Sequence, residues 1–130
     1  MIILPITLCA AAAAAVLNIW LSIRIGMVRT TKKISIGDGG DMELIARMRA
    51  QANFIENTPI VLVLIAVIEL ARTGNVWVMG VAAAYMLGRV AHGVGMDGGP
   101  LGFMRGLGTM ATMLTQLGLG TWAVSIALDM

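Results

Sequence analysis

Hydrophobic positions along the chain gather into four long runs, separated by polar or glycine-rich breaks. A helix needs ~20 consecutive apolar residues to cross the ~30 Å hydrocarbon core of a bilayer, and each run reaches that length. The pattern therefore predicts an all-α integral membrane protein, a bundle of four transmembrane helices. Their approximate ranges are residues 2–27, 42–71, 76–96 and 103–128. Four crossings place both chain ends on one side of the membrane.

The breaks are so short that residues 1–130 are expected to form a single membrane domain. The first contains the turn-forming sequence Gly-Asp-Gly-Gly at 37–40, the second is the tight link 72–75, and the third spans 97–100. Asp41 is expected to cap the second helix, because a carboxylate at a helix start accepts hydrogen bonds from free backbone N–H groups. The short second link predicts that helices two and three pack antiparallel as neighbours.

The composition supports a bilayer location and excludes several functions. Hydrophobic residues make up 58% of the chain and charged residues 12%, too apolar a balance for a water-soluble domain of 130 residues. The formal net charge is +2 and the nine basic residues are scattered, so no nucleic-acid partner is expected. The single cysteine, Cys9, lies in an alanine-rich run, and the single histidine, His92, has no second ligand near it. No metal site is expected.

The distribution of basic residues predicts the orientation of the chain. Arg72 alone lies at the link between helices two and three, whereas the other eight lie in or toward the first and third links. Cytoplasmic loops carry the excess of lysine and arginine in membrane proteins. The first and third links are therefore expected to face the cytoplasm.

Three of the predicted helices carry polar stripes near the cytoplasmic side. Arg49, Asn53 and Glu56 share one face of helix two by their spacing, and Arg89 and His92 share one face of helix three. The stripe on helix four consists of Arg105, Thr109, Thr112 and Gln116. An ionised side chain at the bilayer centre costs ~2.5–3.5 kcal/mol, so such a cluster implies partners, water or a ligand. The alternative is that these groups only hydrogen-bond one another across the bundle, at ~0.6 kcal/mol per bond.

Glu56 and Arg89 are predicted to form an ion pair inside the bundle. Glu56 lies thirteen residues before Glu69, near the far end of helix two, and Arg89 lies fourteen residues beyond Asn75, at the start of helix three. With a rise of ~1.5 Å per residue, both lie ~20 Å from the non-cytoplasmic end. Antiparallel neighbours can bring two charges at matching depth together.

Small residues predict where helices approach one another closely. Gly102 and Gly106 lie four residues apart around the start of helix four. This spacing lets two helix backbones come into contact, because no side chain separates them. We therefore expect a contact between helices or between subunits at this point.

Two segments of the chain resemble the motifs of a known membrane family. Residues 47–59, RMRAQANFIENTP, are similar to the signature of the MAPEG family, the membrane-associated proteins in eicosanoid and glutathione metabolism. Residues 88–92, GRVAH, are similar to the family's third-helix motif, and Arg105 follows where its members carry the arginine that faces the glutathione sulfur. Nearly the whole chain is covered by the resemblance. The loop 37–40 and the run 56–59 look most like an uncharacterised bacterial branch, the YecN-like proteins.

The resemblance implies a homotrimer in the bacterial inner membrane that binds glutathione in clefts between subunits, open toward the cytoplasm. Arg49, Asn53 and Glu56 would hold the peptide and its charged ends, and Arg105 would stabilise its thiolate. The residues that would line the pocket or reach in from a neighbouring chain are Arg29, Gln51, Arg89 and His92. Arginines suit the two carboxylates of glutathione, and a glutamate suits its ammonium group.

The resemblance also implies an activity, that of a glutathione transferase or peroxidase acting on a lipophilic small molecule that arrives from membrane lipid. Met96 and Thr109 stand where characterised synthases carry aromatic hydroxyl groups. A non-catalytic protein that binds a lipid or another anion in the same cleft is therefore a second interpretation. A third is a small-molecule exporter, which the absence of a carboxylate from helix one disfavours.

Overall fold

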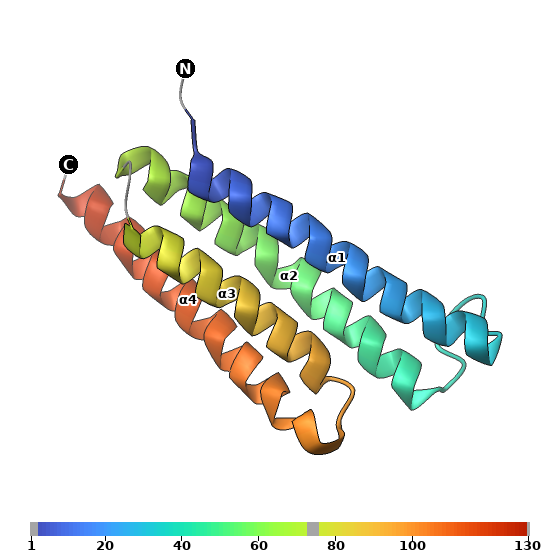
Figure 1. Ribbon diagram of the computed structural model, residues 1–130. Coiled ribbons are helices and arrows are strands. Elements are labelled where there is room, and N and C mark those ends of the chain that lie inside the picture. Colours follow the sequence, from blue (N-terminus) through green and yellow to red (C-terminus); the bar gives the residue numbers. More distant parts are fainter. Residues whose placement is uncertain (1–2, 73–75, 130) are drawn as a thin grey trace.

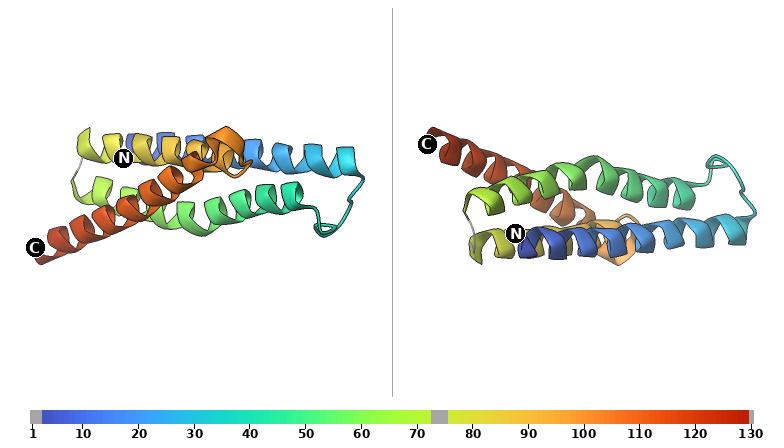
Figure 2. Two further views of the ribbon diagram at one scale, coloured as in Figure 1. Left: turned by 90° about the horizontal axis from the view of Figure 1, so that it is seen from below. Right: turned by 90° about the horizontal axis from the view of Figure 1, so that it is seen from above.

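The computed structural model describes residues 3–72 and 76–129, which form a bundle of helices. The elements are α1 (Pro5–Lys32), α2 (Met42–Ala71), α3 (Val76–Gly95), the short 3-10 helix η1 (Gly99–Leu101) and α4 (Phe103–Leu128). Figure 1 shows both chain termini at one end, here called the terminal end. The opposite end carries the α1–α2 and α3–α4 connections and is here called the loop end. Figure 2 shows that α4 crosses the other helices obliquely. The predicted all-α fold is confirmed for the described residues.

The predicted boundaries agree closely with the structure for three of the helices. α2 and α4 begin and end at the predicted residues, and α3 ends one residue earlier, at Gly95. α1 begins at Pro5, which suits a first helical turn because proline lacks an N–H group that would have no partner there. It also continues past the apolar run to Lys32, because polar residues extend a helix as readily as apolar ones once it leaves lipid. Of the predicted link 72–75, residues 73–75 lie outside the described residues.

Three segments of the described chain are long and apolar enough to span a membrane, namely α1, α2 and the stretch Gly99–Leu128. Large apolar side chains such as Val63 and Leu117 are exposed on their outer surface. Such a surface is stable against lipid but not against water. The protein is therefore an integral membrane protein. That α3, which carries Arg89 and His92, also crosses the membrane stays a prediction.

At the loop end, Asp41 caps α2 as predicted. Its carboxylate accepts a hydrogen bond from the Leu44 N–H at 2.9 Å and two from Lys32 Nζ, at 2.7 and 2.9 Å. The hydrogen bond from Lys32 is the main reason that the pKa of the Asp41 carboxyl lies below its usual range. Arg29 Nη1 donates to the carbonyl oxygen of Gly37 at 2.8 Å. These contacts join the end of α1 to the start of α2.

α3 and α4 approach each other at positions where only glycine fits. A Cβ atom on Gly95 would lie 2.1 Å from Arg105 N, and one on Gly108 would lie 2.4 Å from the carbonyl oxygen of Gly88. Because the obstructing atoms belong to the backbone, they could not move aside without separating the helices. This glycine contact determines how α4 lies against α3.

The contact expected at Gly102 and Gly106 is not formed between helices of the same chain. Nothing lies within 4 Å of a Cβ position on Gly106, and the atoms near Gly102 belong to the preceding turn. The sequence spacing was suitable, but these two residues do not face α3. A contact between subunits at these positions stays a prediction.

At the terminal end, Glu69 of α2 holds the beginning of α1. Its Oε1 accepts a hydrogen bond from Ile6 N at 2.9 Å, and its Oε2 accepts from Thr7 N at 2.8 Å and Thr7 Oγ1 at 2.7 Å. Glu69 is only 2% exposed. α1 has no side-chain cap of its own, so the carboxylate of the neighbouring helix satisfies backbone N–H groups that would otherwise lack partners.

Candidate functional site

The residues predicted to bind glutathione or, for Arg105, to stabilise its thiolate lie in separate surroundings within one chain. They are Arg29, Arg49, Gln51, Asn53, Glu56, Arg89, His92 and Arg105. Some contact α1 or its loop, some are buried between helices, and some lie on the outer surface of the bundle. A single chain therefore does not bring them all together.

Arg89 and His92 of α3 lie inside the bundle, at 2% and 5% exposure. Arg89 Nη1 donates to Thr112 Oγ1 of α4 at 2.9 Å, and its guanidinium carbon lies 5.9 Å from the centre of the Phe54 ring of α2. Arg89 Nε and His92 Nδ1 are buried without a hydrogen-bond partner among the described residues. A buried guanidinium that no carboxylate of the described residues neutralises is costly.

The predicted ion pair between Glu56 and Arg89 is wrong for the described chain. Glu56 is exposed, and no ion pair within 4.0 Å joins it to Arg89. The two residues lie at similar depth, but depth does not determine the direction in which a side chain points. Phe54 faces Arg89, and Glu56, two residues further along, points roughly 200° away around the helix axis.

Asn53 lies beside a polar contact between α2 and α4. Gln116 Nε2 donates to Asn57 Oδ1 at 2.9 Å, and Asn57 Nδ2 donates to the backbone carbonyl oxygen of Asn53 at 2.7 Å. The side-chain amide of Asn53 itself makes no hydrogen bond with the described residues and is half-buried. It is thus available to a ligand, whereas Asn57, which was not predicted as a site residue, holds α2 to α4.

Gln51 and Arg29 make their contacts within their own chain. Gln51 Nε2 donates to Asn18 Oδ1 at 3.1 Å and to Ser22 Oγ at 2.6 Å, both on α1. Arg29 donates to the α1–α2 loop through Gly37. The expectation that both reach a ligand from a neighbouring chain stays a prediction, and for Gln51 the amide oxygen is the group left free to do so.

Arg49, Glu56 and Arg105 are exposed, and their side chains make no hydrogen bond or ion pair with any described residue. Glu56 lies fourteen residues from Met42 and fifteen from Ala71, so it is at the middle of α2, ~21–23 Å from either end. The hydrocarbon core is ~30 Å thick, which places Glu56 within it. A lone charge facing lipid is costly.

Ion pairs at the loop end tie the α3–α4 connection to α1 and α2. Asp97 is bound by Arg24 of α1, and its Oδ1 lies 3.4 Å from Arg47 Nε of α2. Arg24 also donates to the carbonyl oxygen of Gly93 at 2.7 Å, and Arg47 donates to that of Arg24 at 3.1 Å. This network positions the start of α4, where Arg105 lies. The sequence signal for these ion pairs was slight, because Arg24 stood out only as part of the excess of positive charge at this end and Arg47 only as the first residue of the segment 47–59.

The MAPEG family model matches residues 7–125 of the chain. The chain belongs to the MAPEG family. The match extends from the first turn of α1 to the last turn of α4, so it covers all four helices of this MAPEG protein. No curated protein and no solved structure matches it. Its assignment to the YecN-like bacterial branch stays a prediction.

This MAPEG chain presents charged and polar side chains that have no partner among the described residues. Arg49 and Arg105 offer two unpartnered cations, Glu56 offers one anion, and Asn53 offers an amide. The described residues contain no group of three or more His, Cys, Asp or Glu side chains that could hold a metal ion. The unpartnered groups come from α2 and α4, so a ligand or subunit seated there would contact both helices.

Proposed function

We propose that this MAPEG protein assembles as a homotrimer and binds glutathione in clefts between adjacent subunits that open toward the cytoplasm. The observation that supports the proposal most is the exposure of Arg49, Glu56 and Arg105 without partners in their own chain. A second copy packed against α2 removes Glu56 from lipid. Glutathione brings two carboxylates for the arginines and one ammonium group for the glutamate, so the charges balance.

Arg105 is the residue that we propose to act on the reacting atom. Its guanidinium would stabilise the thiolate that glutathione forms when its thiol gives a proton to water. The thiolate sulfur would then bond to an electrophilic carbon of a lipophilic molecule from the membrane, and a leaving group such as halide would depart with the electrons of the broken bond. Lowering a thiol pKa from ~8.5 to ~6 requires roughly 3.4 kcal/mol, and a cation ~4 Å away at an effective dielectric constant of ~20 supplies about 4 kcal/mol. Arg105 occupies the third position of α4, at the loop end, where a water-soluble peptide can reach it.

Calorimetric titration of the purified protein with glutathione in detergent tests this function. Saturable binding is expected for the parent protein. Arg49→Ala, Glu56→Ala and Arg105→Ala are each expected to weaken it by about tenfold or more, because each removes a charge-assisted hydrogen bond of ~1.5–3 kcal/mol. Arg72→Ala is the matched control, since Arg72 lies at the terminal end, 3.8 Å from Asp129. Absence of binding to well-folded parent protein would refute the proposal.

The trimeric assembly can be tested independently of the ligand. The chain has a mass of 13.7 kDa, and native mass spectrometry from detergent is expected to show a species of three chains. The exposure of Glu56 in the middle of α2 supports this assembly, because a neighbouring chain would separate the carboxylate from lipid. A monomer that binds glutathione with the full affinity of the parent preparation would contradict a site between subunits.

A second candidate function is binding of a lipid or another anion in the same cleft without catalysis. Two observations favour it: Met96 packs against the hydrophobic core, and Thr109 Oγ1 donates to the carbonyl oxygen of Arg105 at 2.9 Å. Neither residue offers the reacting thiol an aromatic hydroxyl. Glutathione-dependent conjugation of an aryl halide distinguishes the candidates, because turnover that Arg105→Ala abolishes requires an enzyme, and binding without turnover supports the second candidate.

A further inference from the structure

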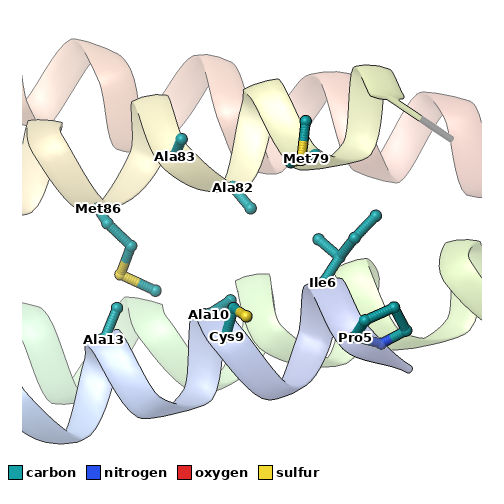
Figure 3. Close-up of a pocket in the computed structure, with 9 residues that line it drawn as sticks. All are labelled: Pro5, Ile6, Cys9, Ala10, Ala13, Met79, Ala82, Ala83 and Met86. Atoms are coloured by element: carbon teal, nitrogen blue, oxygen red, sulfur yellow. The ribbon is translucent and has the colours of Figure 1, made fainter. Parts of the chain in front are cut away.

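A narrow apolar groove runs between α1 and α3, beginning at the terminal end. Figure 3 shows its first part, a pocket of about 430 Å³ with Cys9 on the α1 side and Met79 on the α3 side. A second pocket, of about 580 Å³, continues between the same two helices and shares its lining with the first at Ala13, Ala83 and Met86. The two pockets form one continuous channel along the bundle, here called the α1–α3 groove.

The length of the α1–α3 groove matches one leaflet of a bilayer. It extends from Pro5 to Leu17 along α1 and from Met79 to Val90 along α3. These stretches rise ~16–18 Å, whereas the hydrocarbon core is ~30 Å thick. A transmembrane helix of another subunit would need the whole thickness, but a lipid chain needs only half of it.

The width of the groove also favours an occupant thinner than a helix. A helix ~10 Å across and ~16 Å long fills roughly 1,300 Å³, which exceeds the volume of the two pockets together, at about 430 and 580 Å³ with a shared part. The groove is deep because alanines line it, and Ala10 and Ala82 at its floor are 5% and 6% exposed. Small side chains leave a slot between the helices.

The chemistry of the groove excludes a charged or hydrogen-bonding ligand. No charged side chain lines either pocket, and the lining consists of alanine, larger aliphatic residues, proline, methionine and Cys9. Met79 and Met86 are flexible and can adjust to an irregular chain of methylene groups. Because α1 is long and apolar enough to span the membrane, the groove beside it opens toward lipid.

We propose that the α1–α3 groove is a binding site for one acyl chain of a membrane phospholipid. Its lining, length and width fit a single hydrocarbon chain of the leaflet at the terminal end. The site is separate from the proposed glutathione site, since Arg105 lies at the loop end and the groove begins at the terminal end. The bound acyl chain would fill the gap that the side chains of α1 and α3 leave between the two helices along this half of the bundle.

Photolabelling of the parent protein tests the site without any substitution. The protein is reconstituted in phosphatidylcholine vesicles in which a fraction of the acyl chains carries a diazirine, irradiated, and mapped by peptide mass spectrometry. Adducts are expected at Cys9, Met79 and Met86 in excess over Leu117, which is 70% exposed on the outer surface. Labelling of Leu117 equal to that of the groove would overturn the proposal.

A pair of matched variants sharpens the test. Ala13→Phe places a ring where the two pockets meet, whereas Ala11→Phe adds the same ring to an exposed position of α1 outside both pockets. Adduct yield in the groove is expected to fall by about tenfold in Ala13→Phe and to remain unchanged in Ala11→Phe. Efficient linkage of Cys9 between chains by a short bismaleimide would show that a second copy occupies the groove, and would also overturn the proposal. Glutathione binding is expected to persist in both variants, so the two proposals can fail separately.

Discussion

Gly108→Ala is expected to destabilise the protein by pushing α4 away from α3. The added Cβ would lie 2.4 Å from the carbonyl oxygen of Gly88 and 2.5 Å from His92 Cβ. These atoms are backbone or fixed to it, so the helices themselves must move. Overpacking of a close-packed contact costs ~1–3 kcal/mol. Thermal unfolding in detergent, followed by circular dichroism, measures the effect.

Gly106→Ala is the matched control for this contact, because it lies on the same helix with nothing within 4 Å of its Cβ position. Alanine is a better helix former than glycine by ~0.8–1 kcal/mol, so this variant is expected to equal or exceed the stability of the parent protein. Equal unfolding temperatures for the two variants would mean that α3 and α4 do not meet at Gly108.

Glu69→Ala is expected to have the second large effect, by freeing the first turn of α1. The buried carboxylate accepts hydrogen bonds from Ile6 N, Thr7 N and Thr7 Oγ1, and alanine replaces none of them. Hydrogen bonds to a charged group contribute ~1.5–3 kcal/mol each, and part of the loss is recovered where water reaches the freed groups. We expect a destabilisation of about 2–4 kcal/mol, together with faster amide hydrogen exchange at Ile6 and Thr7.

Two further variants separate the hydrogen bonds of Glu69 from its packing. Thr7→Val removes only the hydroxyl donor and is expected to cost ~0.5–1.5 kcal/mol. Glu69→Gln keeps the shape of the side chain and one acceptor oxygen, so its stability is expected to lie between those of the parent and Glu69→Ala. If Glu69→Gln unfolds at the same temperature as Glu69→Ala, the charge of Glu69 rather than its hydrogen bonds holds the start of α1.

Much of the fold could be predicted because lipid imposes a simple rule on sequence. Every backbone group in a bilayer must be paired within its own segment, so runs of ~20 apolar residues form helices. The predicted ends of α2 and α4 were correct, and Asp41 marked a helix start by local chemistry alone. The end of α1 at Lys32 was missed because polarity marks the edge of lipid and not the end of a helix.

Less of the candidate site could be predicted, because it depends on the direction of side chains around each helix. Depth along α2 and α3 suggested that Glu56 would meet Arg89, but Phe54 occupies that place and Glu56 faces outward. The residues that position α4, Arg24 and Asp97, come from segments more than seventy residues apart. No local sequence pattern predicts an ion pair between residues so far apart in the chain.

The sequence by itself determined that the protein is a helical membrane protein, which residues carry its charges, and to which family its motifs relate. These properties are local, since they follow from composition, spacing and capping within single segments. Only the tertiary structure decided which charges are neutralised inside the chain and which remain exposed. It also decided that Gly95 and Gly108, rather than Gly102 and Gly106, bring α3 and α4 together. The rotation of each helix about its own axis determines which glycines face the neighbouring helix. That rotation results from the packing of all four helices together.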